Sequence, residues 1–272
     1  MQTRCDPCAQ AGQCVFAALR ERFLHVFLLL LLLITLSPRV LAEPLNSILQ
    51  SQAVDEAPAE GSAQQPIRKL IVIGFMGGNV HATNLIHREA QLIQSLQQGY
   101  PLAIHAAIFA NRDGKSALKS VLAVLDEDKD GYVSDAEKSA ARIVLFGHSW
   151  GASQTVTLAN QLNKLGIPVL LTIQVDSVQK QNQNDEQIPP NVREAINFYQ
   201  SEGLLRGRSL IVARDPEKTK ILGNHQSSYR QNRVSCAGYP WYARAFMRRH
   251  IQIENDPAVW EQIESLIVAK IL

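Results

Sequence analysis

The chain has 272 residues, of which 46% are hydrophobic and 19% are charged, a composition typical of a globular protein. Its 27 basic residues nearly balance its 25 acidic residues, which gives a formal net charge of +2. This balance does not favour a nucleic acid as partner. The length allows one domain of about two hundred residues together with additional segments.

Residues 1–42 resemble a secretory signal peptide that follows a long leader. Arg20 and Arg22 precede an apolar run that starts at Val26, Ser37-Pro38-Arg39 ends this run, and Val40-Leu41-Ala42 supplies the residues that a signal peptidase reads. The pattern predicts cleavage after Ala42 and an exported protein, periplasmic or secreted. An uncleaved N-terminal anchor is the alternative, although the apolar core is shorter than the roughly twenty residues of a membrane helix. Membrane contact is expected only through this segment, and only if it stays uncleaved.

The stretch 43–66 is rich in Ala, Gln, Ser, Glu and Pro and has little apolar pattern, which predicts a flexible linker. The folded domain is therefore expected to span residues 67–272. Three of the four cysteines lie in the leader, so only Cys236 remains after cleavage and no internal disulfide is expected.

The folded domain is expected to begin with a strand at residues 70–73, a continuous β-branched run suited to burial on both faces. A glycine-rich loop, Gly74-Phe75-Met76-Gly77-Gly78, follows it directly. Residues 84–96 have helical apolar spacing, and 103–109 indicate the next strand. Three histidines in this part lack a metal-ligand spacing and are predicted to be surface or packing residues: His81, His87 and His105.

Residues 126–137 match the twelve-residue calcium loop of an EF-hand at every diagnostic position, and helices are expected on both sides, at 116–125 and 135–141. The predicted ligands are Asp126, Asp128, Asp130, the Tyr132 carbonyl, Ser134 and Glu137. No second loop accompanies this one, although EF-hands normally pair. We therefore predict a structural calcium ion rather than a sensor, with a solvated acidic turn as the alternative. No organic cofactor is expected.

An apolar run at residues 143–146 leads into Gly147-His148-Ser149-Trp150-Gly151, and helical apolar spacing follows from Ala152 to Leu165. Gly-x-Ser-x-Gly between a strand and a helix indicates a nucleophile elbow, in which the serine occupies a strained turn and its hydroxyl is exposed above the sheet.

These residues resemble the elbow of the α/β-hydrolase superfamily, and the resemblance extends over roughly Ile67 to Leu272. It implies an α/β fold with a mostly parallel sheet flanked by helices, here with an EF-hand-like insertion before the nucleophile strand. It also implies a serine nucleophile, Ser149, followed along the chain by a carboxylate and then a histidine. The glycine-rich loop would supply one oxyanion donor, the N–H of Phe75 or Met76, and Trp150 would supply the other.

Two aspartates compete for the acid. Asp176 ends the buried strand predicted at 167–175, whereas Asp215 lies between two short apolar runs, 209–213 and 219–222, which look like a hairpin. Residues 191–199 are expected to form a helix between these candidates. Because turn chemistry would occupy Asp215, we favour Asp176.

Two histidines compete for the base. His250 directly precedes an expected C-terminal helix, as the superfamily's layout requires, and His225 lies in a polar loop. We favour His250.

The sequence thus predicts a calcium-stabilised, exported serine hydrolase that cleaves an ester or thioester of a small-molecule or lipid-like acyl substrate. The alternative is a non-catalytic calcium-binding envelope or interaction module that retains the hydrolase fold. The acyl-chain preference does not follow from the residues.

Overall fold

The computed structural model describes residues 69–271. The predicted signal peptide (1–42) and linker (43–66) lie outside the described residues. Regular structure begins at Leu70, close to the predicted start of the domain. Within the described part, no helix has both the length and the hydropathy that crossing a membrane requires.

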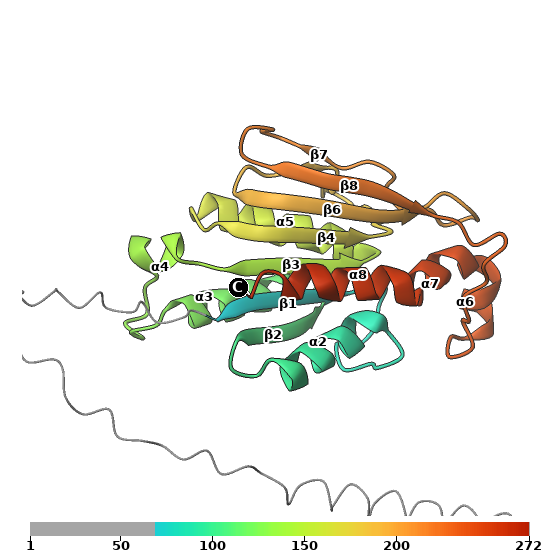
Figure 1. Cartoon of the computed structure of the whole chain (residues 1–272), viewed down its shortest axis with the longest axis horizontal. Helices are drawn as coiled ribbons and strands as arrows, with labels where there is room; N and C mark the ends of the chain where they lie inside the picture. The colour runs from blue at the N-terminus through green and yellow to red at the C-terminus, as the bar shows by residue number, and fades with distance from the viewer. Residues whose placement is uncertain (1–68, 272) are drawn as a thin grey trace, which may run out of the picture. The chain divides into compact units, whose positions relative to one another are not determined.

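Six strands, all paired in parallel, form the central sheet in the order β2-β1-β3-β4-β6-β8 (Figure 1). The strands are β1 (Leu70–Met76), β2 (Ile104–Ala110), β3 (Ile143–His148), β4 (Val169–Val175), β6 (Val192–Gln200) and β8 (Lys220–Ser227). Every residue of β1 and of β3 is buried, as expected for parallel strands with helices on both faces. This arrangement confirms the predicted α/β-hydrolase-type sheet.

Helices cover both faces of the sheet. The helices of the described part are α2 (Arg88–Gly99), α3 (Gly114–Leu125), α4 (Asp135–Ser139), α5 (Trp150–Lys164), α6 (Trp241–Phe246), α7 (Arg248–Glu254) and α8 (Pro257–Val268). Helices α2 and α8 pack on one face with Val72 and Phe146, and α3 and α5 pack on the other with Ile73 and Leu145. Alternate strand residues therefore build two cores, because successive side chains of a strand point to opposite faces. In Figure 1, α8 crosses in front of the sheet and α5 lies behind it.

The prediction of a helix at 191–199 is wrong, because this segment forms strand β6, which lies between β4 and β8. Ile196 and Phe198 are buried in the sheet's core, and β-branched and aromatic side chains of this kind suit a pleated surface. The segment is also short, and apolar periodicity does not separate strands from helices over so few residues.

The hairpin expected around Asp215 is also wrong. The first run contributes only β7 (Val212–Ala213), which pairs in parallel with β5 (Gln187–Ile188) in a separate two-stranded sheet. The second run begins β8, which joins the main sheet in parallel with β6. A turn does lie between the two runs, but it connects two sheets.

Candidate active site

Ser149 lies between the end of β3 and the start of α5, at the carboxyl edge of the sheet. Its backbone has φ 57° and ψ −123°, a conformation with positive φ that is strained for a residue with a side chain. Its N–H donates to the Val175 carbonyl at 2.9 Å, which fixes the serine against the end of the neighbouring strand β4. The residue is 7% exposed. The strained turn between strand and helix agrees with the predicted elbow, whereas the serine is more buried than the prediction of an exposed hydroxyl implied.

The two glycines of the elbow allow backbone segments to pack where a side chain would collide. A Cβ on Gly147 would lie 2.5 Å from the carbonyl carbon of Gly151, and a Cβ on Gly151 would lie 2.2 Å from the Phe75 carbonyl oxygen. The start of α5 therefore contacts the end of β1 directly. This close approach explains in physical terms why the sequence has glycine on both sides of the serine.

Asp176 follows β4 directly and is fully buried. Its Oδ1 accepts hydrogen bonds from the N–H groups of Gln200 at 3.0 Å and Gly207 at 2.9 Å, and its Oδ2 accepts one from Gln200 Nε2 at 2.8 Å. His250 Nδ1 lies 2.6 Å from the same Oδ2. Three donors thus fix the carboxylate, and its Oδ2 remains able to accept a hydrogen bond from the His250 imidazole.

Gln200 and Gly207 were not singled out in the sequence, although they orient the acid. A Cβ on Gly207 would lie 2.2 Å from Asp176 Oδ1, so this position must be glycine for the carboxylate to fit. No local pattern connects these residues to Asp176, because β6 and the following loop bring them together only in the folded chain.

His250 lies on α7 and is buried. Its contact with the Asp176 carboxylate assigns the ring proton to Nδ1, which leaves Nε2 as the proton acceptor. The ring of His250 packs against the ring of His148, with centroids 4.4 Å apart, and His148 precedes the serine. Within residues 69–271, the Ser149 hydroxyl makes no hydrogen bond. The fold thus brings Ser149 and Asp176 to adjoining strand ends and places His250, on α7, in contact with Asp176.

The competing candidates lie in other surroundings. Asp215 lies in a turn, where it pairs with Lys218 at 3.0 Å and accepts the Glu217 N–H at 3.1 Å. The hydrogen bond from Lys218 lowers the pKa of Asp215. His225 lies within β8, where its ring stacks on Phe198 with centroids 5.5 Å apart.

The predicted oxyanion donors lie around the elbow. Trp150 is the first residue of α5, so its N–H has no partner within the helix. Phe75 and Met76 are buried at the end of β1, where they pair in register with Phe109 and Ala110 of β2. The loop beyond them touches the serine, since a Cβ on Gly77 would lie 3.3 Å from Ser149 Cβ.

A second group of buried polar residues lies beside the elbow. His87 Nδ1 is 2.5 Å from Glu254 Oε1, and His148 Nδ1 is 3.5 Å from Glu254 Oε2 and 3.9 Å from Glu89 Oε1. Burial, followed by the charge of Glu254, raises the pKa of Glu89 to about 8. Burial lowers the pKa of His148 to about 4. Burial alone would raise the pKa of Glu254, but His148 and His87 hold it at about 2.

The predicted calcium loop connects α3 and α4. The carboxylates of Asp126, Asp128 and Asp130 each offer an oxygen within 4.8 Å of the others, and Asp126 Oδ1 is buried without a hydrogen-bond partner in the described part of the chain. Gly131 has φ +88°, the left-handed turn for which the motif uses glycine. These aspartates fit a cation that prefers oxygen ligands.

Glu137 closes the same loop. Its carboxylate accepts hydrogen bonds at 2.8 Å from the Glu127 N–H, the Ser134 N–H and the Ser134 hydroxyl. The bonds from Ser134, and then the one from Glu127, lower the pKa of Glu137. This residue and Ser134 also form a capping box at the start of α4, so both predicted ligands have a structural role in the helix.

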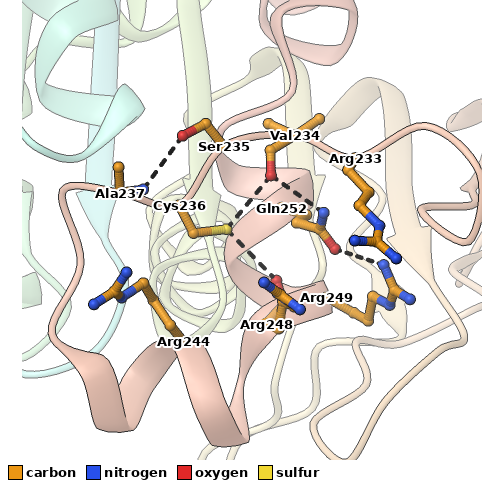
Figure 2. A pocket seen from close by; sticks show the side chains of 9 residues that line it. All are labelled: Arg233, Val234, Ser235, Cys236, Ala237, Arg244, Arg248, Arg249 and Gln252. Carbon is orange, nitrogen blue, oxygen red and sulfur yellow. Dashed lines mark hydrogen bonds between the residues drawn. The ribbon is translucent and has the colours of Figure 1, made fainter.

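A cavity of about 380 Å³ lies along α6, α7 and the segment 233–237 (Figure 2). Its lining includes four arginines and no acidic residue: Arg233, Arg244, Arg248 and Arg249. Of these four side chains, only Arg249 makes hydrogen bonds within residues 69–271, to Gln252 at 2.8 Å and to the Tyr229 carbonyl. The lining of this cavity is therefore basic, although Arg249 also pairs with Glu202 at 3.5 Å.

No protein-family model and no curated protein matches the chain. Among solved structures, it is similar to an acetylxylan esterase at 10% identity and TM-score 0.38, over 75% of this chain and 99% of that one. It is also similar to RedJ, solved with a polyethylene glycol molecule in its active site, at 11% identity and TM-score 0.33, over 79% of this chain and 95% of that one. Likenesses this low identify neither an activity nor a substrate.

Proposed function

We propose that this protein is a serine hydrolase that cleaves an ester or thioester through an acyl-enzyme. The observation that carries the proposal is the 2.6 Å contact between His250 Nδ1 and Asp176 Oδ2, beside a serine with positive φ. A buried carboxylate that orients a buried imidazole next to a strained serine is the arrangement that serine nucleophiles require.

In the proposed mechanism, His250 Nε2 takes the proton of Ser149 Oγ as the oxygen attacks the acyl carbon. Asp176 keeps the proton on Nδ1 and stabilises the imidazolium that forms. The N–H of Trp150 and an N–H from the Phe75–Met76 region stabilise the oxyanion. The imidazolium then protonates the leaving group, and a water molecule activated by the same histidine hydrolyses the acyl-enzyme.

The resting hydroxyl of Ser149 makes no hydrogen bond within residues 69–271, which is compatible with this mechanism. Catalytic hydrogen bonds are often long before the substrate binds, and they tighten in the Michaelis complex.

The proposed substrate is a small-molecule or lipid-like acyl compound, and the proposed location is outside the cytoplasm. The export proposal depends on the apolar run and the Val40-Leu41-Ala42 site of the leader. Retention by an uncleaved leader is the alternative.

We also propose that one calcium ion binds residues 126–137 and stabilises the connection that leads into β3. Asp126, Asp128, Asp130, the Tyr132 carbonyl, Ser134 and Glu137 would hold it. The ion would supply charge balance for the clustered carboxylates and take no part in the chemistry.

The test is covalent labelling of the purified chain with a fluorophosphonate probe, together with hydrolysis of p-nitrophenyl esters. Labelling should disappear in Ser149→Ala, and His250→Ala should lose nearly as much rate, because the members of a triad act as a unit. His225→Ala is the matched control and should keep its activity. An unlabelled but folded wild-type protein, or loss of activity in His225→Ala alone, would contradict the proposal.

A further inference from the structure

Four polar side chains from three separate parts of the chain lie close together next to the elbow. His87 and Glu89 lie at the start of α2, His148 ends β3, and Glu254 ends α7. Glu89, His148 and Glu254 are buried, with exposed fractions of 0%, 3% and 2%, and His87 is partly buried. The proposed hydrolytic mechanism uses none of them.

The potential ligand atoms of this group lie within a few ångströms of one another. One ligand atom each from His87, Glu89 and Glu254 falls within 4.8 Å of the others, and His148 Nδ1 lies 3.5 Å from Glu254 and 3.9 Å from Glu89. In a tetrahedral site with bonds of about 2.0 Å, ligand atoms lie about 3.3 Å apart. The two contacts of His148, 3.5 Å and 3.9 Å, lie close to that separation, whereas the 2.5 Å hydrogen bond between His87 and Glu254 would lengthen when an ion binds.

Several of these atoms are buried without a hydrogen bond. In the described part of the chain, neither ring nitrogen of His148 has a hydrogen-bond partner, and Glu89 Oε2 has none either. Buried polar groups in native proteins are nearly always satisfied, so each exception requires an explanation such as an ion. Because His148 Nδ1 faces both glutamates, a cation between them would give this nitrogen and the carboxylates a common partner.

We propose that His87, Glu89, His148 and Glu254 bind one divalent transition-metal ion of the zinc class. Two imidazoles with two carboxylates form a nitrogen–oxygen ligand set that suits Zn²⁺ and disfavours Ca²⁺ and Mg²⁺, which prefer oxygen alone. Once an ion displaces the proton of Glu89, two carboxylates with two neutral imidazoles carry two negative charges, which a divalent cation balances.

Neighbouring groups are placed to orient the ligands. The Gly77 N–H donates to Glu89 Oε1 at 3.1 Å, and the Tyr239 ring packs edge-on against the ring of His87. Such outer contacts fix ligand orientation in metal sites. Four protein ligands complete a tetrahedral shell, so the ion would be structural rather than a second catalytic centre.

Binding of the ion would join the parts that build the active site. His148 is adjacent to Ser149, Glu254 follows His250 by one helical turn on α7, and Glu89 holds the glycine-rich loop through Gly77. The ion would therefore connect the serine, the base and the loop. The proposed metal site goes beyond the hydrolase proposal and does not depend on that proposal being right.

The experiment uses the full chain, stripped with chelator and then saturated with calcium so that the loop at 126–137 is occupied. Zinc is added by calorimetric titration, and the zinc retained after dialysis is measured by mass spectrometry. The wild type should retain one zinc ion more than His87→Asn or Glu254→Gln. Affinity should fall in both variants by more than the roughly 10–100-fold that loss of an outer contact costs.

The controls are His81→Asn, an exposed histidine of the same loop, and Glu261→Gln, an exposed glutamate of α8, and both should bind zinc like the wild type. Cobalt(II) bound in place of zinc should give ligand-field bands without thiolate charge transfer, which separates this site from the cysteines. If a variant does not fold, the wild type still tests the proposal, because zinc should raise the melting temperature of the wild type in a calcium background. Equal zinc in the wild type and a folded His87→Asn, or no rise in wild-type melting temperature, would overturn the proposal.

Discussion

Replacement of Asp176 by asparagine is the sharpest test of the site, because it changes one atom of a buried group whose partners are all known. The two backbone donors, Gln200 N–H and Gly207 N–H, both bond Oδ1, so the amide oxygen of the substituted side chain should occupy that position. The amide NH₂ then replaces Oδ2, where it faces Gln200 Nε2 and His250 Nδ1.

Two consequences follow from this geometry. The NH₂ group can donate to His250 only if Nδ1 has no proton, so the proton moves to Nε2, and the ring can no longer accept one from Ser149. The wrong tautomer lowers turnover by about four orders of magnitude in the serine-protease triad, equivalent to about 5 kcal/mol. The new amide NH₂ and Gln200 Nε2 are both donors and cannot bond each other. The variant therefore loses the hydrogen bond from Gln200 Nε2 to the charged carboxylate, which costs about 1.5–3 kcal/mol of stability.

The assay is kcat/KM for a p-nitrophenyl ester, with near-ultraviolet circular dichroism as the check on folding. Asp215→Asn is the matched control, and it should keep nearly full activity because the Asp215 carboxylate is bonded to Lys218 and the Glu217 N–H within its own turn. Normal turnover in a folded Asp176→Asn variant, with collapse in Asp215→Asn, would refute the reasoning.

Three further predictions concern the elbow, the loop and the leader. Gly151→Ala should destabilise the fold by about 1–3 kcal/mol, as an overpacked core does, because the added Cβ would lie 2.2 Å from the Phe75 carbonyl oxygen. Chemical denaturation measures this loss of stability, and an unchanged midpoint would contradict the prediction. Calcium at a hundredfold excess over Kd should add about 2.7 kcal/mol to the free energy of unfolding, and calorimetry should find this gain absent in Glu137→Gln. Exported material should begin at Glu43 on N-terminal sequencing, whereas an exported chain that retains Met1 would exclude cleavage after Ala42.

The parts of the site that depend on local chain geometry could be predicted from the sequence. The elbow needs glycine on both sides of Ser149 because backbone segments meet there, and those contacts are visible in a five-residue pattern. The loop at 126–137 is also a local pattern, since its aspartates alternate around a single turn, and its binding of calcium stays a prediction. Such patterns can be recognised in a sequence because the physical cause and the pattern lie within one short segment.

The parts of the fold and of the site that depend on contacts across the sheet could not be predicted from a short stretch of sequence. Residues 192–200 form a strand because β4 and β8 flank them, not because of their own periodicity. The choice of Asp176 over Asp215 could only be weighed, because the groups that hold the carboxylate, Gln200 and Gly207, belong to a later strand and loop. Tertiary pairing decides both features, and no single window of sequence contains it.

Helix α7 connects two buried polar groups, one around Asp176 and one around Glu254. His250 and Glu254 are four residues apart and therefore lie on the same side of this helix. The first contacts Asp176 at 2.6 Å, and the second contacts His87 at 2.5 Å and approaches His148 at 3.5 Å. Because the rings of His148 and His250 also pack together, a shift of α7 would disturb both groups at once. A change at Glu254 should therefore reach the proposed base through the position of the helix, even though Glu254 has no part in the proposed proton transfer.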